Sequence, residues 1–332
     1  MHDSRTLRFR RCLLAALAAV SAVAIVPAAR AQGDGWPTKS IRLVVNFPPG
    51  SSPDVLARAV SGPLAQALGQ PVVVDNRSGA SGMIGAELVA KSPPDGYTVL
   101  MTAGSTITTN PFVYPKMAYD TEKDLVPVAA AARVALFLVT RPDLPPNNLR
   151  EFIAYLKAHP GKLSYGSAGN ATGLHLAGEM LKGQAGVDAV HVPYKGASPA
   201  LQGLLSSQID FYFDPGIALQ QVRAGRLKML GVAVAHRSSA FPDVPTLAEA
   251  GLQGFDAGTT HGFYVPAGTP PEVVARLNRE INHALGLPAV RAQIAAIGAE
   301  PTPMTPAQFA AVMADDSRRY GAVIRERGIK AD

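Results

Sequence analysis

Hydrophobic and polar positions along the chain alternate between two periods. Residues 41–47 are β-branched and apolar on both faces, which is typical of a strand buried in a parallel sheet. Residues 53–68 have the pattern of a helix, with Ser52 as the N-cap and Gly69 as the stop. Because strand and helix continue to alternate, we predict parallel sheets with helices on both faces.

The same two periods predict the later elements. Further strands are expected at residues 72–75, 97–102, 136–140, 163–165, 190–194, 209–213, 227–233 and 263–265. Further helices are expected between a glycine-rich turn and Lys91, and at residues 149–159, 172–182, 199–206, 217–224, 271–285, 288–297 and 306–324. Prolines and glycines between residues 242 and 262 interrupt the alternation, and we interpret the interruption as a crossing back to the first domain.

The N-terminal residues have the three parts of a bacterial export signal. A basic stretch ends at Arg11, an apolar run occupies residues 12–26, and a small-x-small site ends at Ala31. The apolar run of 15 residues is shorter than the roughly 20 needed to span a bilayer, so we expect cleavage rather than anchoring. The mature protein would begin at Gln32 and be periplasmic, and the general and twin-arginine export routes both remain open.

Composition and charge narrow the function classes. The 332-residue chain is 47% apolar and 17% charged, which argues against a disordered or fibrous protein. Removal of the leader, with its five arginines and one aspartate, leaves 26 basic and 24 acidic residues in a chain long enough for two α/β domains. No basic stripe remains, so nucleic acid is not an expected partner. The one cysteine, Cys12, lies in the leader, which excludes disulfides and cysteine chemistry in the mature chain.

Two loops that each join a buried strand to a helix are candidates for anion binding, because backbone N–H groups point outward at such helix starts. From the first loop the candidate ligand-binding residues are Pro49, Gly50, Ser51, Ser52 and Asp54. From the second loop they are Ser167, Ala168, Asn170 and Thr172, and Asp214 follows at the carboxyl end of a later strand. A capped helix start without a ligand is the alternative for either loop, and Asp54 would repel a carboxylate placed too close.

Signatures of catalysis are missing from the sequence. Glycines 79, 82 and 85 lack the spacing of a dinucleotide-binding loop, and Ser167 lacks the glycine that a nucleophile elbow needs two residues before it. The histidines of the mature chain form neither an H-E-x-x-H motif nor a close pair. We therefore expect no catalytic residue, no metal site and no cofactor.

Short motifs, taken in sequence order, indicate a protein family. They are Phe47-Pro48-Pro49-Gly50, Asn76-Arg77-Ser78-Gly79, Asp95-Gly96-Tyr97, His191-Val192-Pro193-Tyr194-Lys195-Gly196, Asp243-Val244-Pro245-Thr246 and Pro266-Ala267-Gly268-Thr269-Pro270. With these motifs the chain resembles the Bug family, the periplasmic receptors of tripartite tricarboxylate transporters. The resemblance implies a type II-like, two-lobe α/β periplasmic binding protein, in which each lobe is a mostly parallel sheet flanked by helices and two crossings form a hinge. Lobe 1 would comprise residues 32–133 plus 253–332, and lobe 2 residues 134–252.

The resemblance also implies a function. The two candidate loops would face each other across a cleft, with Ser105 and Asp214 near its edges, and would hold a small organic carboxylate for delivery by a monomeric receptor to membrane permease subunits. A receptor for a membrane sensor kinase would use the same fold, and an exported enzyme acting on a small acid is a third hypothesis. The sequence departs from the family at Ser51, Pro53 and Thr260, where relatives usually have glycine, threonine and tryptophan, so the ligand of a relative should not be assumed.

Overall fold

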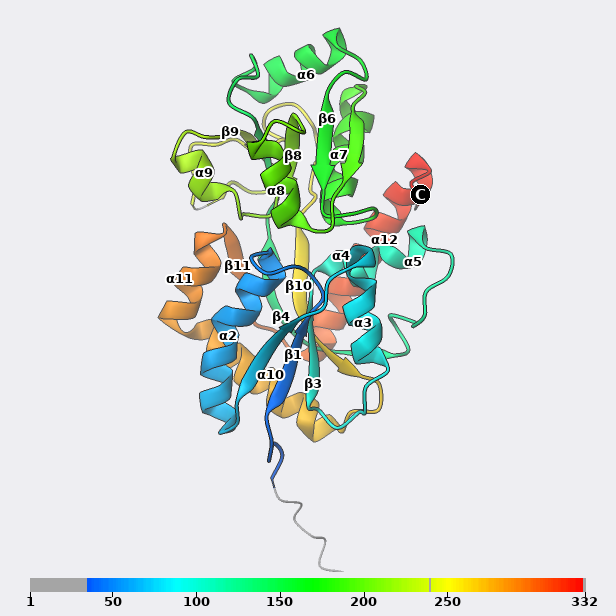
Figure 1. The fold of residues 1–332 in the computed structure, drawn as a ribbon, viewed down its shortest axis with the longest axis vertical. Coiled ribbons are helices and arrows are strands. Elements are labelled where there is room, and N and C mark those ends of the chain that lie inside the picture. Colours follow the sequence, from blue (N-terminus) through cyan, green and yellow to red (C-terminus); the bar gives the residue numbers. More distant parts are fainter. Residues whose placement is uncertain (1–34, 239, 331–332) are drawn as a thin grey trace, which may run out of the picture. The chain divides into compact units, whose positions relative to one another are not determined.

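The computed structural model describes residues 35–238 and 240–330, and residues from Lys39 onward form one compact unit. The predicted cleavage site after Ala31 lies outside the described residues. Within the compact unit, the strands form two separate sheets, each flanked by helices (Figure 1). We call the first sheet with its helices lobe 1 and the second sheet with its helices lobe 2.

The sheet of lobe 1 has six strands in the order β11-β4-β10-β3-β1-β2. They are β1 (Ile41–Val45), β2 (Val72–Asn76), β3 (Thr98–Thr102), β4 (Leu125–Val134), β10 (Thr259–Pro266) and β11 (Ala299–Pro301). The sheet of lobe 2 has five strands in the order β7-β6-β8-β5-β9. They are β5 (Phe137–Thr140), β6 (Ser164–Ser167), β7 (Val190–Pro193), β8 (Phe211–Asp214) and β9 (Lys228–Val232).

Both sheets are mixed, which corrects the expectation of mostly parallel sheets. In lobe 1, β1 is parallel to β2 and β3, but β10 is antiparallel to β3 and β4. In lobe 2, β6 is parallel to β7 and β8, but β5 is antiparallel to β8 and β9. The antiparallel pairs involve strands next to the crossings between the lobes. Such strands are not joined by a βα unit, so nothing requires them to be parallel.

The helices cover the two sheets. Lobe 1 has α2 (Ser52–Leu68), η1 (Ala80–Gly82), α3 (Met83–Ala90), α4 (Gly104–Thr108), α5 (Asn110–Val113), α10 (Pro271–Gly286), α11 (Pro288–Ala296) and α12 (Pro306–Arg327). Lobe 2 has α6 (Leu149–Ala158), α7 (Gly173–Ala185), α8 (Ala197–Leu205) and α9 (Leu219–Arg223). The longer helices agree with the predicted ones to within a few residues, although α2 begins at Ser52 with Ser51, not Ser52, as its N-cap.

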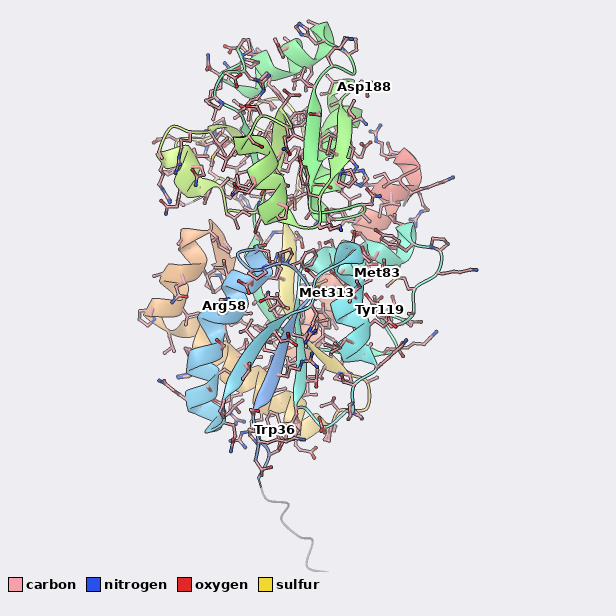
Figure 2. The ribbon with its side chains drawn as sticks, viewed as in Figure 1. Trp36, Arg58, Met83, Tyr119, Asp188 and Met313 are labelled. Carbon is pink, nitrogen blue, oxygen red and sulfur yellow. The ribbon has the colours of Figure 1, made fainter. Side chains whose placement is uncertain are left out.

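Helix α12 contacts both lobes. It begins at a capping box formed by Thr305 and Gln308, and its first half buries Met313 in the core of lobe 1 (Figure 2). Its second half places Tyr320 and Ile324 in a buried cluster with Leu176 of α7. The helix therefore adds packing between the lobes to the two chain crossings.

Charged groups tie the two crossings together beside α12. Arg133, near the end of β4, bonds the carboxylate of Asp256, which precedes β10, at 2.8 Å. The guanidinium of Arg319 donates to the backbone carbonyl of Asp256, and the hydroxyl of Tyr320 donates to that of Gly258 at 2.7 Å. These bonds fix the segment from which β10 enters the sheet of lobe 1.

Candidate functional site

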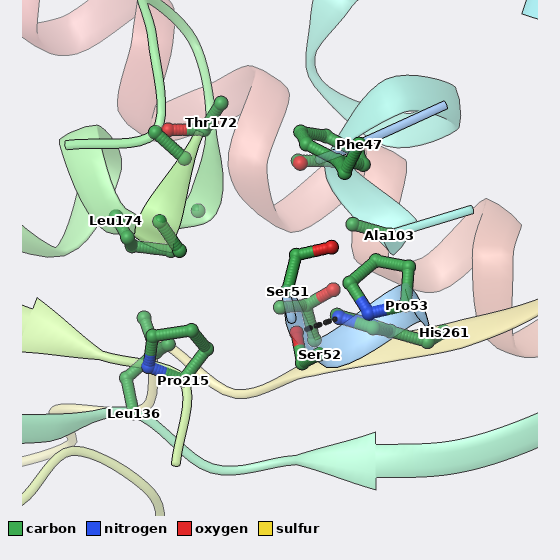
Figure 3. A pocket seen from close by; sticks show the side chains of 15 residues that line it. Phe47, Ser51, Ser52, Pro53, Ala103, Leu136, Thr172, Leu174, Pro215 and His261 are labelled. Atoms are coloured by element: carbon green, nitrogen blue, oxygen red, sulfur yellow. Dashed lines mark hydrogen bonds between the residues drawn. The ribbon is translucent and has the colours of Figure 1, made fainter. Parts of the chain in front are cut away.

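A cavity of about 30 Å³ lies between the two lobes (Figure 3). Its fifteen lining residues are Phe47, Ser51, Ser52, Pro53, Ala103, Ser105, Leu136, Ala168, Thr172, Gly173, Leu174, Ala197, Pro215, Thr259 and His261. The β1–α2 loop and the β6–α7 loop both contribute, because each follows the carboxyl end of a buried strand. A water needs about 10–15 Å³ of such volume, so the lobes as observed leave room for only about two or three water-sized groups.

The structure places five of the eleven predicted site residues at this cavity: Ser51, Ser52, Ser105, Ala168 and Thr172. The other six, Pro49, Gly50, Asp54, Ser167, Asn170 and Asp214, are not among its lining residues.

Asp54 does not line the cavity and belongs to a polar cluster. Its carboxylate accepts hydrogen bonds from the Gly50 N–H at 2.9 Å and from Asn76 Nδ2 at 2.9 Å, and Arg58, one turn along α2 (Figure 2), pairs with it at 3.0 Å. Burial alone would raise the pKa of Asp54, but these hydrogen bonds, led by that of Arg58, lower it below its usual value. The negative charge of Asp54 is thus paired with the guanidinium of Arg58.

Asp214 supports the wall of the cavity from behind. It is fully buried and accepts bonds from the hydroxyl of Tyr212 at 2.7 Å and from the backbone N–H groups of Gly216 and Ala218 at 2.8 and 3.0 Å. Burial raises the pKa of Asp214 to about 6, although the hydrogen bonds oppose that rise. The carboxylate therefore holds the turn that presents Pro215 to the cavity.

The β6–α7 loop is clamped to lobe 1 through its backbone. The carbonyl of Asn170 accepts bonds from the hydroxyls of Ser81 at 2.7 Å and Tyr114 at 3.3 Å, and the carbonyl of Ala171 accepts one from the hydroxyl of Thr109. We call Ser81, Thr109 and Tyr114 the lobe clamp. Its bonds join the two lobes in the observed conformation.

Sequence reasoning missed two polar residues of β10 at the cavity. His261 is buried, and its Nε2 lies 3.0 Å from Ser52 Oγ, whereas its Nδ1 has no hydrogen-bond partner among the described residues. Burial lowers the pKa of His261 to about 3, so the ring is neutral near pH 7. Thr259 Oγ1 is also buried without a partner among residues 35–238 and 240–330. The two-residue spacing of these positions would have revealed them, had the strand been predicted to start before residue 263.

The starts of α2 and α7 meet at the cavity, and neither has a side-chain cap. Ser51 is the N-cap of α2, but its hydroxyl donates to the Pro48 carbonyl at 2.7 Å. Thr172 is the N-cap of α7, but its hydroxyl donates to the Gly169 carbonyl at 2.8 Å. Both helices therefore direct their positive ends and first-turn N–H groups toward one space, an arrangement that favours an anion.

The described part of the chain holds neither a cluster of metal-binding side chains nor a membrane-spanning helix. No group of three or more histidine, cysteine, aspartate or glutamate side chains there could hold a metal ion. No helix there is long and apolar enough to cross a membrane.

Comparison with known proteins decides the family. The family described as "Tripartite tricarboxylate transporter family receptor" matches residues 56–329. This chain belongs to that family. The predicted resemblance is confirmed, and the receptor belongs to a family of binding proteins, not of enzymes.

Three solved structures resemble this receptor closely. R. palustris Rpa4515 with adipate is 34% identical, with a TM-score of 0.87 over 90% of this chain and all of that one. The periplasmic binding protein BugD is 32% identical, with a TM-score of 0.85 over 90% of this chain and all of that one. MatC (Rpa3494) from Rhodopseudomonas palustris with bound malate is 34% identical, with a TM-score of 0.83 over 87% of this chain and all of that one. These neighbours confirm the two-lobe fold, and the receptor is a periplasmic solute-binding protein.

Proposed function

We propose that this receptor captures a small organic carboxylate between its lobes and delivers it to the permease subunits of a tripartite tricarboxylate transporter. The observation that carries this proposal is the meeting of two uncapped helix starts, one from each lobe, at a single cavity. Backbone N–H groups from both lobes can then bind one anion, so the anion favours the closed arrangement. The adipate and malate bound by two similar proteins support a carboxylate group on the ligand.

We assign direct contact with the ligand to the five predicted residues that line the cavity, together with Thr259 and His261. The remaining predicted residues would act from behind, by shaping the loops and the wall. We also propose the division into lobe 1 (32–133 plus 253–332) and lobe 2 (134–252), since the strands of the two sheets fall within these ranges except for Val134, the last residue of β4. A monomer exported by its leader and cleaved after Ala31, with no cofactor, completes the proposal.

Identification of a copurified ligand tests the proposed function. The receptor is released from the periplasm, and denaturation followed by mass spectrometry identifies what it carried. A small carboxylate is expected, whereas a neutral or cationic ligand would overturn the proposal. Incubation of the ligand with pure receptor should form no product. Uptake of the labelled ligand should require both the receptor and its permease, and a kinase response without uptake would favour sensing instead.

A further inference from the structure

Two groups of side chains face each other across the cavity (Figure 3). We call Ser52 and His261 the polar wall, and the apolar Phe47, Pro53 and Ala103 lie on the same side. We call Leu136, Leu174 and Pro215 the apolar wall, and Thr172 lies beside Leu174. Eight of the fifteen lining residues are apolar, and none is an aspartate, glutamate, lysine or arginine. A ligand held by the polar wall would therefore present its remaining atoms to hydrocarbon.

The charged groups nearest in sequence to the cavity are already paired elsewhere. Asp54 and Arg58 bond each other at 3.0 Å, and Asp214 is bonded to a hydroxyl and two backbone N–H groups. A second carboxylate on the ligand would consequently lie against the apolar wall with no cation among the lining residues. Desolvating an unpaired carboxylate in such surroundings is strongly unfavourable, whereas an alkyl group gains free energy there.

We propose that the receptor selects a monocarboxylate with a compact apolar body and rejects dicarboxylates of the same length. This inference rests on the proposed function, because it assumes that a carboxylate occupies the cavity. Because the observed cavity of about 30 Å³ is smaller than such a ligand, the lobes must stand further apart around it than they do here. The carboxylate is then held by the first-turn N–H groups of α2 and α7 and by the hydroxyl of the polar wall, and the apolar body packs on Leu136, Leu174 and Pro215. A monocarboxylate ligand would differ from the adipate and malate bound by the two similar proteins.

A neighbouring cavity offers a place where the second carboxylate of a dicarboxylate could bind. It has a volume of about 210 Å³, shares Phe47 and Ala168 with the first cavity, and includes Lys195 in its lining. A dicarboxylate long enough to pass Phe47 would place its second carboxylate near this ammonium group. The experiment must therefore include a long diacid as well as a short one.

The test measures affinity for two matched pairs of acids by calorimetry on the mature receptor, after dialysis has removed copurified ligand. Butanoate is compared with succinate, and hexanoate with adipate. Each monoacid should bind at least 100-fold more tightly than its diacid, because the diacid leaves one carboxylate unpaired. Failure of all four acids to bind would also overturn the inference. The identity of the copurified ligand then decides the proposed function separately.

Two lysine variants test whether the apolar wall is what favours monoacids over diacids. Leu174→Lys places a cation in the apolar wall and should shift the ratio of diacid to monoacid affinity by at least 10-fold toward the diacid. Val190→Lys adds the same charge on the exposed surface of lobe 2 and should leave the ratio unchanged. Adipate binding as tightly as hexanoate to the unaltered receptor, and weakening in Lys195→Met, would overturn the inference while leaving carboxylate capture intact. The comparison of acids on the unaltered receptor stands even if Leu174→Lys fails to fold.

Discussion

Removal of one hydroxyl of the lobe clamp should weaken ligand binding without touching the cavity. The hydroxyl of Thr109 lies within hydrogen-bonding distance of two carbonyls, that of Ser105 in its own lobe and that of Ala171 in lobe 2. Thr109→Val keeps the shape of the side chain and removes the one hydroxyl proton that these two carbonyls share. In the closed form the buried carbonyl of Ala171 is left unpaired, whereas opening would expose it to water.

The structure supplies both the magnitude and a matched control. A buried acceptor without a partner costs about 1–3 kcal/mol, so the closed form and the apparent affinity should fall by about 5- to 160-fold. Thr108 is equally buried, and its hydroxyl donates to the Gly104 carbonyl at 3.1 Å, within lobe 1. Thr108→Val therefore loses the same kind of bond inside α4 without changing the contact between the lobes.

The two variants are compared by calorimetric titration with the copurified ligand and by thermal melts without ligand. Both variants should lower the melting temperature by similar amounts, but only Thr109→Val should weaken binding. Small-angle scattering should show that Thr109→Val is less compact than Thr108→Val at the same subsaturating ligand concentration. Equal affinities for the two variants would refute the idea that the clamp contributes to closure.

Three further outcomes are expected. Burial depresses the pKa of His261 to about 3 from an ordinary 6.5, so its contribution to stability is present above pH 6.5 and is lost as the pH falls toward 3. The melting temperatures at pH 4.5 and 7.5 should therefore differ less for His261→Gln than for wild type or for the exposed control His159→Gln. Ser52→Ala should weaken ligand binding by roughly 10- to 150-fold. Asn170→Ala should weaken it much less, because the backbone carbonyl of residue 170 still accepts the bond from Ser81. Equal losses of affinity in calorimetry would contradict the placement of Ser52, but not Asn170, at the cavity. The intact mass of periplasmic protein should correspond to a chain starting at Gln32, and a retained leader would refute the cleavage prediction.

Most of the fold follows from local sequence patterns. Of the elements that were not predicted, the short α4, α5 and β11 lie within lobe 1, whereas β4 and the first residues of β10 lie next to the crossings. The run at β1 and the proline-marked start of α2 are strong local signals, and both elements lie where they are predicted. Strand β4 was not predicted, because Pro127 and the alanines at residues 129–132 lack a β-branched pattern. Its pairing with β10 along most of its length makes it a strand, and that pairing involves residues more than a hundred positions away.

In the candidate site, too, some residues could be predicted from local sequence patterns and others could not. The two loops could be found because a helix start after a buried strand is visible in the sequence, and Ser52 and Thr172 do reach the cavity. Leu136 and His261 could not be found in this way, since the crossings bring them to the cavity from distant parts of the chain. A sequence pattern also gives no sign that Asp214 turns toward Tyr212 and the following backbone.

The lobe clamp has a consequence for how such receptors diversify. Ser81, Thr109 and Tyr114 donate to main-chain carbonyls at residues 170 and 171, and every amino acid supplies that carbonyl. Mutations that change the side chains of the β6–α7 loop can therefore accumulate without removing the acceptors on which closure depends. In the proposed mode of binding, recognition and closure would be encoded at different positions, so a lineage could change its ligand and keep the same hydrogen bonds between the lobes.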